Sequence, residues 1–268
     1  MLNTRPNEGF IKENHFTKNH KASMNILVCI THVPDTTSRI AFTENNTKFD
    51  KNGVQFIIGP YDDYALARAV ELKEANGGKV TVLNVGEAET EPTLRKALAI
   101  GADEAIRVNA FPSDSYFVAR QIADVAKQGE YDLILMGRES IDFNGGMVHG
   151  MVGEMLGLPS FSPVMVLEVE GNAAKITREI EGGKEILEVN LPFVAGCQEP
   201  IAEWKIPNMR GIMSARTKPL NVVEPTDNTK LTEIAQYELP APKGAVKMID
   251  ANNVEELVNL LKNEAKVI

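Results

Sequence analysis

The sequence predicts an α/β protein with a doubly wound, mostly parallel sheet, an antiparallel extension and a C-terminal arm. Between residues 25 and 159, short apolar runs alternate with segments of helical periodicity, joined by short links. After Pro159 the pattern changes to three strand-like segments separated by the turn pairs Gly171-Asn172 and Gly182-Gly183. With 43% hydrophobic and 24% charged residues, the chain has the composition of a globular protein with a full core.

The parallel part of the sheet is expected from four apolar runs, at residues 25–31, 79–85, 104–108 and 133–136. A helix should begin at Pro60, because proline suits the first turn. Thr90 is the expected N-cap of a second helix that Gly101 ends, and Ser115 is the expected N-cap of a third.

The antiparallel extension is expected at residues 164–170, 174–181 and 185–191. Residues 198–219 are predicted to form a proline-containing loop and a short helix. Residues 221–242 are rich in proline and threonine and have little core of their own. A last amphipathic helix is expected at 253–267, and such a tethered helix packs on its own core or on a partner subunit.

These patterns divide the chain into three parts. Residues 1–23 are polar and have no apolar core of a signal peptide, and one arginine with two glutamates does not fit a mitochondrial presequence. We expect 1–23 to be a disordered leader, from an upstream start codon or from the expression vector. Residues 24–220 should form the α/β domain, and residues 221–268 an arm that packs on a partner subunit.

Charge and cysteine content restrict the possible functions. A net charge of −9 argues against nucleic acid as a partner, because binding phosphates requires a basic face. No apolar run is long enough to span a membrane, so direct membrane insertion is not expected. Cys29 and Cys197 form no CxxC pair or metal-spaced set. Two free thiols in a reducing cytoplasm is the simpler interpretation, and a single disulfide is the alternative.

The segment from Tyr131 to Pro159 is the most informative part of the chain. A buried strand feeds a turn that contains Gly137 and Asn144-Gly145-Gly146, and apolar residues then return at helical spacing. This arrangement puts unpaired N–H groups at a helix N-terminus beyond a strand's carboxyl end, where phosphates bind in α/β sheets. The alternative is a structural connection that needs glycine only for its backbone conformation.

Several catalytic signatures are absent from the sequence. It contains no GxGxxG, no GxxxxGK[ST] and no GxSxG. His32 and His149 could approach the expected site, but a lone histidine there is more often a packing or hydrogen-bonding residue. Met147, Met151 and Met155 form a stripe at helical spacing, typical of core or interface. A nucleotide-binding architecture without acid–base pairs suggests a binding or carrier protein rather than an enzyme.

Six segments of the chain carry motifs that occur in order along it. They are ILVCITHVPDT at 26–36, GPYDDYAL at 59–66, LAIGAD at 98–103, GRESID at 137–142, ITREIEGGKE at 176–185 with Leu187 and Pro192, and IPN with RGIM at 206–213. Together these segments resemble the β subunit of electron-transfer flavoprotein. The resemblance covers nearly all of residues 24–225.

The resemblance implies an adenine-nucleotide α-hydrolase-like (Rossmann-like) fold and one half of an αβ heterodimer. Such a heterodimer carries electrons from dehydrogenases, among them the acyl-CoA dehydrogenases of fatty acid β-oxidation, to a quinone-linked acceptor. The FAD is held mainly by the α subunit, and the β subunit holds a structural AMP. Tyr61 occupies the position from which the family points an aromatic ring toward the flavin. The implied cofactor-binding residues are Cys29, Gly59, Pro60, Tyr61, Asp62, Val85, Gly137, Arg138, Glu139, Ser140, Ile141, Asp142, Phe143, Asn144, Gly145, Gly146, Met147 and Val148.

Four departures from the family pattern bear on this site. Many relatives have polar side chains where this chain has Gly145, Gly146, Met147 and Val148, so backbone N–H groups would have to bind the phosphate. Electron-bifurcating relatives hold a second FAD and tend to read DGDTAQVGP, whereas residues 142–146 read DFNGG, which favours AMP. Gly59 replaces the usual asparagine, which removes one potential hydrogen-bonding side chain. Ala195 breaks an aliphatic pair of the family signature.

The loop 198–218 has the composition of a protein-docking surface. From Lys205 to Lys218 it carries four cations and no acids, beside the chain's only tryptophan, Trp204. The alternative is a solvated loop with a half-buried tryptophan. In the family this loop recognises dehydrogenases through an aliphatic anchor at the position of Ile206. The expected docking residues are Trp204, Lys205, Ile206, Pro207 and Arg210.

Three other functions remain as alternatives to the electron carrier. One is a bifurcating-type β subunit with a second FAD, and another is a stand-alone adenine-nucleotide-binding protein with no redox role. An adenylate-using enzyme of the same superfold would need a loop such as SGGxDS, which is absent. A carrier would form a yellow complex when co-expressed with an α subunit, and a stand-alone binder would not.

Overall fold

The computed structural model describes residues 23–268, so the expected leader lies outside the described residues except for Ser23. The chain forms two compact units. The first contains the residues up to Ile40 and those from Lys51 to Glu233, and the second contains 41–50 and 234–268. The first unit carries the sheet and all of the residues discussed below as a site.

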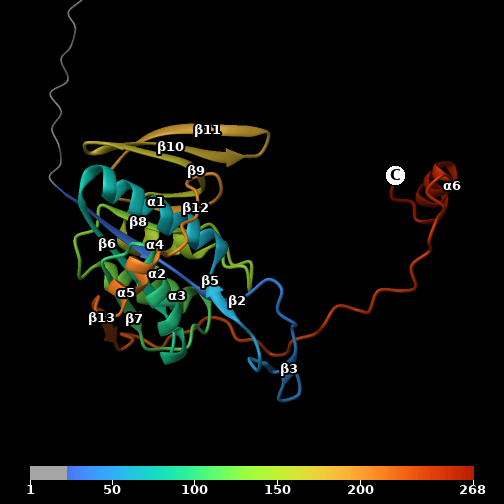
Figure 1. Cartoon of the computed structure of the whole chain (residues 1–268), viewed down its shortest axis with the longest axis horizontal. Coiled ribbons are helices and arrows are strands. Elements are labelled where there is room, and N and C mark those ends of the chain that lie inside the picture. The colour runs from blue at the N-terminus through green and yellow to red at the C-terminus, as the bar shows by residue number, and fades with distance from the viewer. Residues whose placement is uncertain (1–22) are drawn as a thin grey trace, which may run out of the picture. The chain divides into compact units, whose positions relative to one another are not determined.

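The predicted doubly wound, mostly parallel sheet with an antiparallel extension is confirmed. Its nine strands run in the order β11-β10-β9-β12-β8-β1-β6-β7-β13, and those from β9 to β13 are parallel neighbours. β10 and β11 form an antiparallel hairpin beside β9, in yellow in Figure 1. In chain order the strands are β1 (Met24–Cys29), β6 (Gly78–Val85), β7 (Glu104–Val108), β8 (Leu133–Gly137), β9 (Ser160–Glu170), β10 (Ala173–Ile180), β11 (Gly183–Asn190), β12 (Phe193–Cys197) and β13 (Leu220–Val223).

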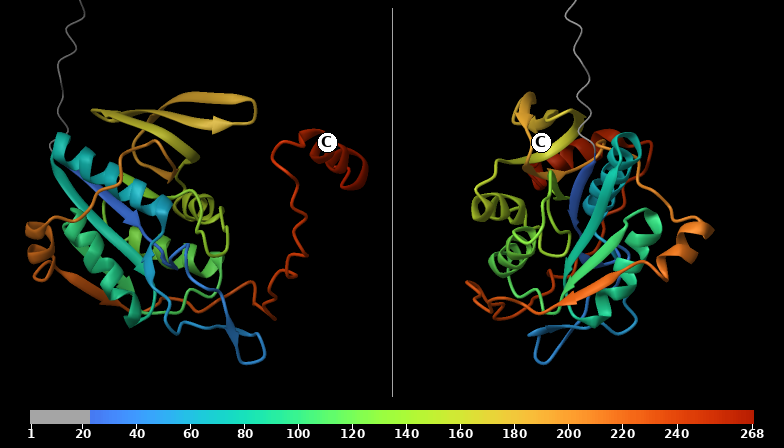
Figure 2. Two further views of the ribbon diagram at one scale, coloured as in Figure 1. Left: turned by 45° about the vertical axis from the view of Figure 1, so that its right-hand side comes forward. Right: turned by 90° about the vertical axis from the view of Figure 1, so that its left-hand side faces the viewer.

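Helices cover both faces of the sheet, as Figure 2 shows on its right side. Ile26 and Val28 of β1 face a core shared with α1 and α2, whereas Leu27 and Cys29 face a core shared with α3 and α4. This alternation follows from the two-residue period of a strand and explains why the runs read as continuously apolar. The helices are α1 (Pro60–Asn76), α2 (Glu91–Ile100), α3 (Ser115–Ala126), α4 (Val148–Leu156) and α5 (Met209–Ala215).

One predicted helix cap is wrong, and the other is right in position only. The N-cap of α3 is Asp114, whose side chain accepts a hydrogen bond from the N–H of Phe117 at 2.7 Å, and Ser115 is the first helical residue. Thr90 is the N-cap residue of α2 as predicted, but its hydroxyl donates to the carbonyl of Glu87 instead of accepting from the helix. Thr90 ends the 3₁₀ turn Ala88–Thr90 and is already in a helical conformation, so it cannot act as a side-chain cap.

Two strands of the nine-stranded sheet were not anticipated from the sequence. β12 is buried along its whole length between β8 and β9, and so connects the antiparallel extension to the parallel sheet. β13 pairs with β7, so the sheet continues beyond residue 220, where we expected the domain to end. The following segment lies along α3, where the Gln121 side chain binds the backbone of Thr226 and Asp227.

Smaller elements complete the two units. In the first unit, β2 (His32–Pro34) pairs with β5 (Phe56–Ile58). In the second unit, β3 (Phe42–Thr43) and β4 (Lys48–Phe49) form a hairpin, and the ring of Phe42 stacks on Tyr237 with centroids 4.7 Å apart. The expected last helix forms as α6 (Val254–Asn259) and the following turn Leu260–Glu264. No helix within residues 23–268 is long and apolar enough to cross a membrane.

Candidate functional site

The expected cofactor-binding residues lie along the rim formed by the carboxyl ends of β1, β6 and β8. β1 is the strand from which the winding of the sheet changes direction, because β6 lies on one side of it and β8 on the other. Ligands of open α/β sheets bind in the crevice at such a switch point. The structure brings together Cys29, Val85 and Gly137, which end these three strands, with the start of α1 and the segment 138–148.

Asp62 connects the ends of β1 and β8. Its Oδ1 accepts a hydrogen bond from the backbone N–H of Gly137 at 2.7 Å. Its Oδ2 accepts hydrogen bonds from the backbone N–H and the hydroxyl of Thr31, at 2.8 and 2.6 Å. The residue is only 3% exposed, and burial raises the pKa of its carboxyl to about 6, although the three donors oppose that shift. One buried carboxylate therefore fixes the geometry of the crevice.

Two glycines leave the space that this carboxylate occupies. A Cβ on Gly137 would lie 2.6 Å from Oδ1 of Asp62 and 2.7 Å from Cβ of Tyr61. A Cβ on Gly59 would lie 2.3 Å from the Thr31 hydroxyl oxygen and 2.6 Å from Oδ2 of Asp62. The Thr31 hydroxyl therefore occupies the position that the Cβ of an asparagine at position 59 would need. This explains why the chain has glycine there.

Arg138 places a fixed positive charge at the beginning of the glycine-containing loop. Its guanidinium lies over the ring of Tyr61, with Cζ 4.9 Å from the ring centroid. Nη1 donates to the side-chain oxygen of Gln198 at 2.9 Å, and Nη2 pairs with Glu139 at 3.1 Å. The Nε atom is buried and has no hydrogen-bond partner among the described residues. A held cation with an unused donor suits an anionic ligand.

The second half of the loop presents backbone rather than side chains. A Cβ on Gly145 or Gly146 would make only an ordinary contact of 3.5 Å, with Oγ of Ser115 or the carbonyl oxygen of Arg138. Packing within the chain therefore does not require these two glycines. α4 begins directly after the loop, with no side-chain cap and no acid in its first turn. Its first N–H groups are available to an anion, and the small residues before it allow a close approach.

The chain is similar to proteins of one known family. Residues 46–228 match the family model described as the electron transfer flavoprotein domain. The β subunit from Bacillus subtilis is 35% identical over 260 residues, covering 91% of this chain and 100% of that protein. This chain belongs to the electron transfer flavoprotein family. It is similar to the β subunits of that family. The human β subunit is 30% identical over 92% of this chain and 100% of its own length.

A third relative of this electron transfer flavoprotein chain has a more specialised name. The caffeyl-CoA reductase-Etf complex subunit CarD from Acetobacterium woodii is 30% identical over 91% of this chain and 98% of its own length. β subunits of this family pair with an α subunit and are typically electron carriers rather than enzymes. The recognition made from the six sequence segments is therefore confirmed at the level of family and subunit.

Three features of the site in this electron transfer flavoprotein chain were missed by the sequence reasoning. The carboxylate role of Asp62 was not assigned, although the residue was included in the site. Thr31 and Gln198 were not included, yet they hold Asp62 and Arg138 in place. The sequence indicates these two residues only by their position. Thr31 comes two residues after the end of β1, and Gln198 comes one residue after the end of β12.

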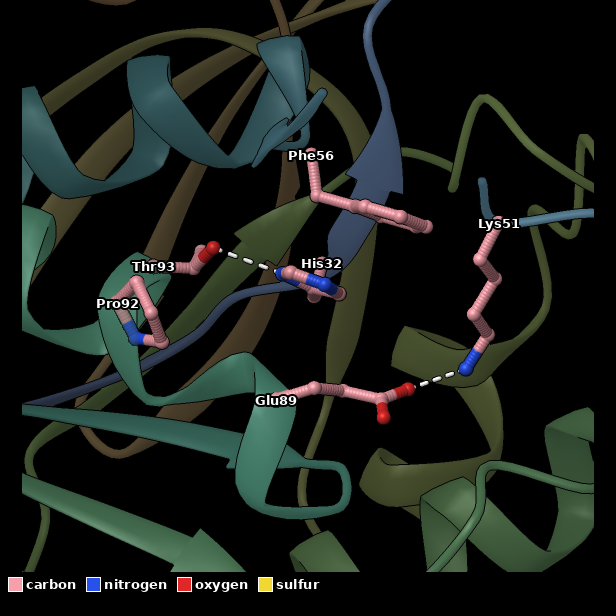
Figure 3. Close-up of a pocket in the computed structure, with 6 residues that line it drawn as sticks. All are labelled: His32, Lys51, Phe56, Glu89, Pro92 and Thr93. Carbon is pink, nitrogen blue, oxygen red and sulfur yellow. Dashed lines mark hydrogen bonds and ion pairs between the residues drawn. The ribbon is translucent and has the colours of Figure 1, made fainter. Parts of the chain in front are cut away.

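The two histidines near the site have structural partners in this family member. Figure 3 shows the ring of His32 stacked under Phe56, with centroids 4.4 Å apart, while Nδ1 lies 2.8 Å from the Thr93 hydroxyl. Burial lowers the pKa of His32, so its ring is neutral at pH 7. Nδ1 of His149 lies 3.3 Å from the Ser160 hydroxyl, and burial lowers its pKa as well. Both arrangements are those of packing residues rather than of acids or bases.

His32 also lines a cavity of about 430 Å³, and Figure 3 draws the residues around it. Pro92 and Thr93 at the start of α2 form one wall, and an ion pair between Lys51 and Glu89 lies opposite. The cavity lies beside α2, whereas the glycine-containing loop leads into α4 on the other face of the sheet. None of the expected cofactor-binding residues lines it.

The two thiols and the methionine stripe also have structural positions. Cys29 and Cys197 are free and buried, and burial raises both thiol pKa values well above the ordinary range. Both are therefore protonated and unreactive. Met151 and Met155 pack against the core under α3 and α4, whereas Met147 is 52% exposed at the mouth of the loop.

The expected docking loop is exposed in this electron transfer flavoprotein chain. Ile206 is 75% exposed, Trp204 is 57% exposed, and Met209 and Met213 of α5 extend the apolar surface. Asn208 caps α5 by accepting from the N–H of Gly211 at 2.8 Å. The cap orients the helix, and its packing leaves the apolar side chains in solvent.

Proposed function

We propose that this chain is the β subunit of a heterodimeric electron transfer flavoprotein that carries electrons from dehydrogenases to a quinone-linked acceptor. FAD would be held mainly by the α subunit, and this chain would hold a structural AMP at the rim. The observation that carries the proposal is the combination, at the switch point of the sheet, of a fixed guanidinium, two glycines that internal packing does not require, and an uncapped helix. The compartment we propose is the cytoplasm.

The rim fits a nucleotide for two reasons. The Nε–H of Arg138 is a hydrogen-bond donor without an acceptor among the described residues. Gly145 and Gly146 have no side chains, so phosphate oxygens have room to approach their backbone N–H groups. We assign the phosphate to residues 137–148, and the nucleoside to Cys29, Val85 and the segment 59–62, which end β1 and β6 and begin α1 at the same rim. AMP supplies no redox chemistry; its binding free energy would stabilise the folded heterodimer.

FAD would supply the redox chemistry of the complex. This chain would place the ring of Tyr61 close to the flavin. Arg138 fixes the ring of Tyr61 by stacking on it, and Gln198 and Glu139 in turn fix Arg138. A second FAD in place of AMP is the alternative suggested by the likeness to CarD. The sequence DFNGG at 142–146 favours AMP, and mass analysis of the nucleotides released from the purified complex distinguishes the two.

We assign recognition of electron donors, among them acyl-CoA dehydrogenases, to the loop 198–218. An exposed aliphatic anchor, Ile206, lies among cations in a chain of net charge −9. The anchor would determine how long a partner stays bound, and the charged rim would determine the encounter rate and its salt dependence. Residues 221–232 of the expected arm bond to this chain's own domain, so only the part beyond Glu233 would pack on the α subunit, since its last helix buries no side chain within this chain.

Substitution of the anchor tests this function. Ile206→Ala should slow dehydrogenase-dependent reduction of the flavin severely, while FAD content and reduction by dithionite stay intact. Ile186→Ala is a matched control, because Ile186 is also exposed, at 62%, but lies on β11. Arg210→Glu should flatten the ionic-strength dependence if the partner surface is acidic. Loss of FAD in Ile206→Ala as large as the loss of activity would instead place this loop in the α–β interface.

A further inference from the structure

A small hollow lies between the first turn of α1 and the segment that follows β12. It encloses about 190 Å³ and is lined by Pro60, Asp63, Tyr64 and Trp204. Two of the four lining side chains are aromatic, one is a proline and one is a carboxylate. The hollow therefore combines an acid with apolar ring faces, which is the combination that proteins use to bind organic cations.

The carboxylate in this hollow has no direct hydrogen bond or ion pair. Within residues 23–268 the side chain of Asp63 bonds to no other residue, and Lys96 acts on it only through its charge. Burial raises the pKa of this carboxyl to about 6, only partly opposed by the charge of Lys96 and reinforced by that of Asp62. A partly desolvated, unpaired carboxylate is stabilised by any cation that can reach it.

The residues around the hollow increase its preference for a cation. The Tyr64 hydroxyl donates to Oε2 of Glu199 at 3.2 Å, and the charge of Glu203 also acts on Tyr64. Lys205, the cation next to Trp204 in the sequence, pairs with Glu74 at 3.3 Å. Lys205 is therefore directed toward Glu74, and around the hollow the charges of Glu199, Glu203 and Asp62 are opposed by that of Lys96.

The hollow is continuous with the exposed docking loop. Trp204 lines it and is still 57% exposed, and Ile206 follows two residues later. In Figure 2, on the left, the segment after β12 passes beside α1, in agreement with the bond between Tyr64 and Glu199. The hollow is smaller than the usual 300–1,000 Å³ of small-molecule sites, roughly the size for one side-chain head group.

We propose that this hollow binds one arginine or lysine side chain of the protein that docks on the loop 198–218. The head group would lie against Trp204 and Tyr64 and pair with the carboxylate of Asp63. This inference rests on the docking role proposed above for the same loop. It adds a requirement on the docking partner. The partner must present an acidic surface to Arg210 and its neighbours, and it must also carry a lysine or arginine that reaches the hollow when Ile206 is bound.

A small probe tests the hollow without any dehydrogenase. The chain contains a single tryptophan, so labelling it with ¹⁵N-tryptophan and pairing it with unlabelled α subunit leaves one indole resonance, that of Trp204. Titration with Nα-acetyl-argininamide should shift this resonance in a saturable way. The citrulline analogue has nearly the same shape without the charge, and should not shift it.

Two variants connect the shift to the carboxylate. Asp63→Asn should weaken binding of Nα-acetyl-argininamide about tenfold or more, since it removes a charge-assisted pairing. Asp63→Glu should retain part of it. An equal response to both probes, or an unchanged response in Asp63→Asn, would overturn the proposal. A shift in the isolated full chain that is absent from the heterodimer would identify the α subunit as the occupant and refute the docking assignment.

Kinetics separate this inference from the proposed function. Asp63→Asn should slow dehydrogenase-dependent flavin reduction about tenfold, with unchanged FAD content. If Ile206→Ala slows that reduction and Asp63→Asn does not, the docking loop stands and the cation site is refuted. If the probe shifts Trp204 as expected but neither variant slows reduction, the hollow binds cations, but its assignment to a docked partner fails together with the docking role.

Discussion

Replacing Asp62 by asparagine measures the free-energy cost of the charge buried at the switch point. The carboxyl pKa is about 6 in the folded chain against 3.8 as the ordinary value, a difference of roughly 2 units or 3 kcal/mol. Because the folded pKa is raised, protonation favours folding. This stabilisation is complete below about pH 4 and is lost as the pH rises through 6.

Asparagine removes the charge but not the need for acceptors. Asp62 accepts hydrogen bonds on both carboxylate oxygens, from Gly137 on one and from Thr31 on the other. An amide offers one oxygen, so one buried N–H loses its acceptor at a cost of about 1–3 kcal/mol. At pH 7.5 this loss offsets the removed burial penalty, and the variant should lie within about 2 kcal/mol of the wild type. At pH 4 only the loss remains.

The measurement is urea unfolding of the wild type and of Asp62→Asn, followed by circular dichroism between pH 4 and 7.5. The difference in unfolding free energy between the two proteins should change by roughly 3 kcal/mol across this range. Other carboxyls, including Asp63, titrate in both proteins and cancel to first order. Thr31→Val should move the midpoint of the wild-type transition to higher pH, because it removes one donor to the carboxylate. Parallel curves for wild type and Asp62→Asn would refute the reasoning.

Three further predictions concern the glycines of the rim and the flavin. Gly137→Ala should lower the unfolding free energy by about 1–3 kcal/mol, because its Cβ would collide with Asp62 and Tyr61. Gly145→Ala should be nearly neutral, because its Cβ would make only an ordinary contact. Thermal unfolding measures both, and equal effects would contradict the packing argument. Gly146→Val should remove AMP from the purified heterodimer and lower its thermal stability, and unaltered AMP on mass analysis would place the nucleotide elsewhere. The chain purified without its α subunit should show no visible flavin absorbance, because it has no FAD fingerprint; stoichiometric bound flavin would favour the second-FAD alternative.

Local patterns along the chain were sufficient for most of the parallel sheet. The strands β1, β6, β7 and β8 and the helices between them follow from apolar runs and helical periodicity, and the structure shifts their ends by no more than a few residues. That the expected site residues meet at one rim also followed, because the carboxyl ends of parallel strands must lie together. These features depend on interactions within short segments and on the period of the strand and the helix.

β12 and β13 could not be placed in the same way. The five residues of β12 are too few to show a period, and what makes them a central strand is their insertion between β8 and β9. β13 is an edge strand that is only half-buried. It pairs with β7 because α5, which precedes it in the chain, packs on α2 and brings the chain back to the sheet edge. Strand order is a property of the assembled sheet.

The sequence by itself determined the fold class, the family resemblance and the segments that meet at the rim, because strand and helix periodicity and the matching motifs are local properties. Only the tertiary structure decided that Asp62 joins Thr31 to Gly137, that Gln198 and Tyr61 hold Arg138, and that Asp63 shares a hollow with Trp204. In each case the partners are separated by tens of residues along the chain. Their charges and hydrogen bonds interact only after hydrophobic burial has brought the strand ends together, so no local pattern encodes them.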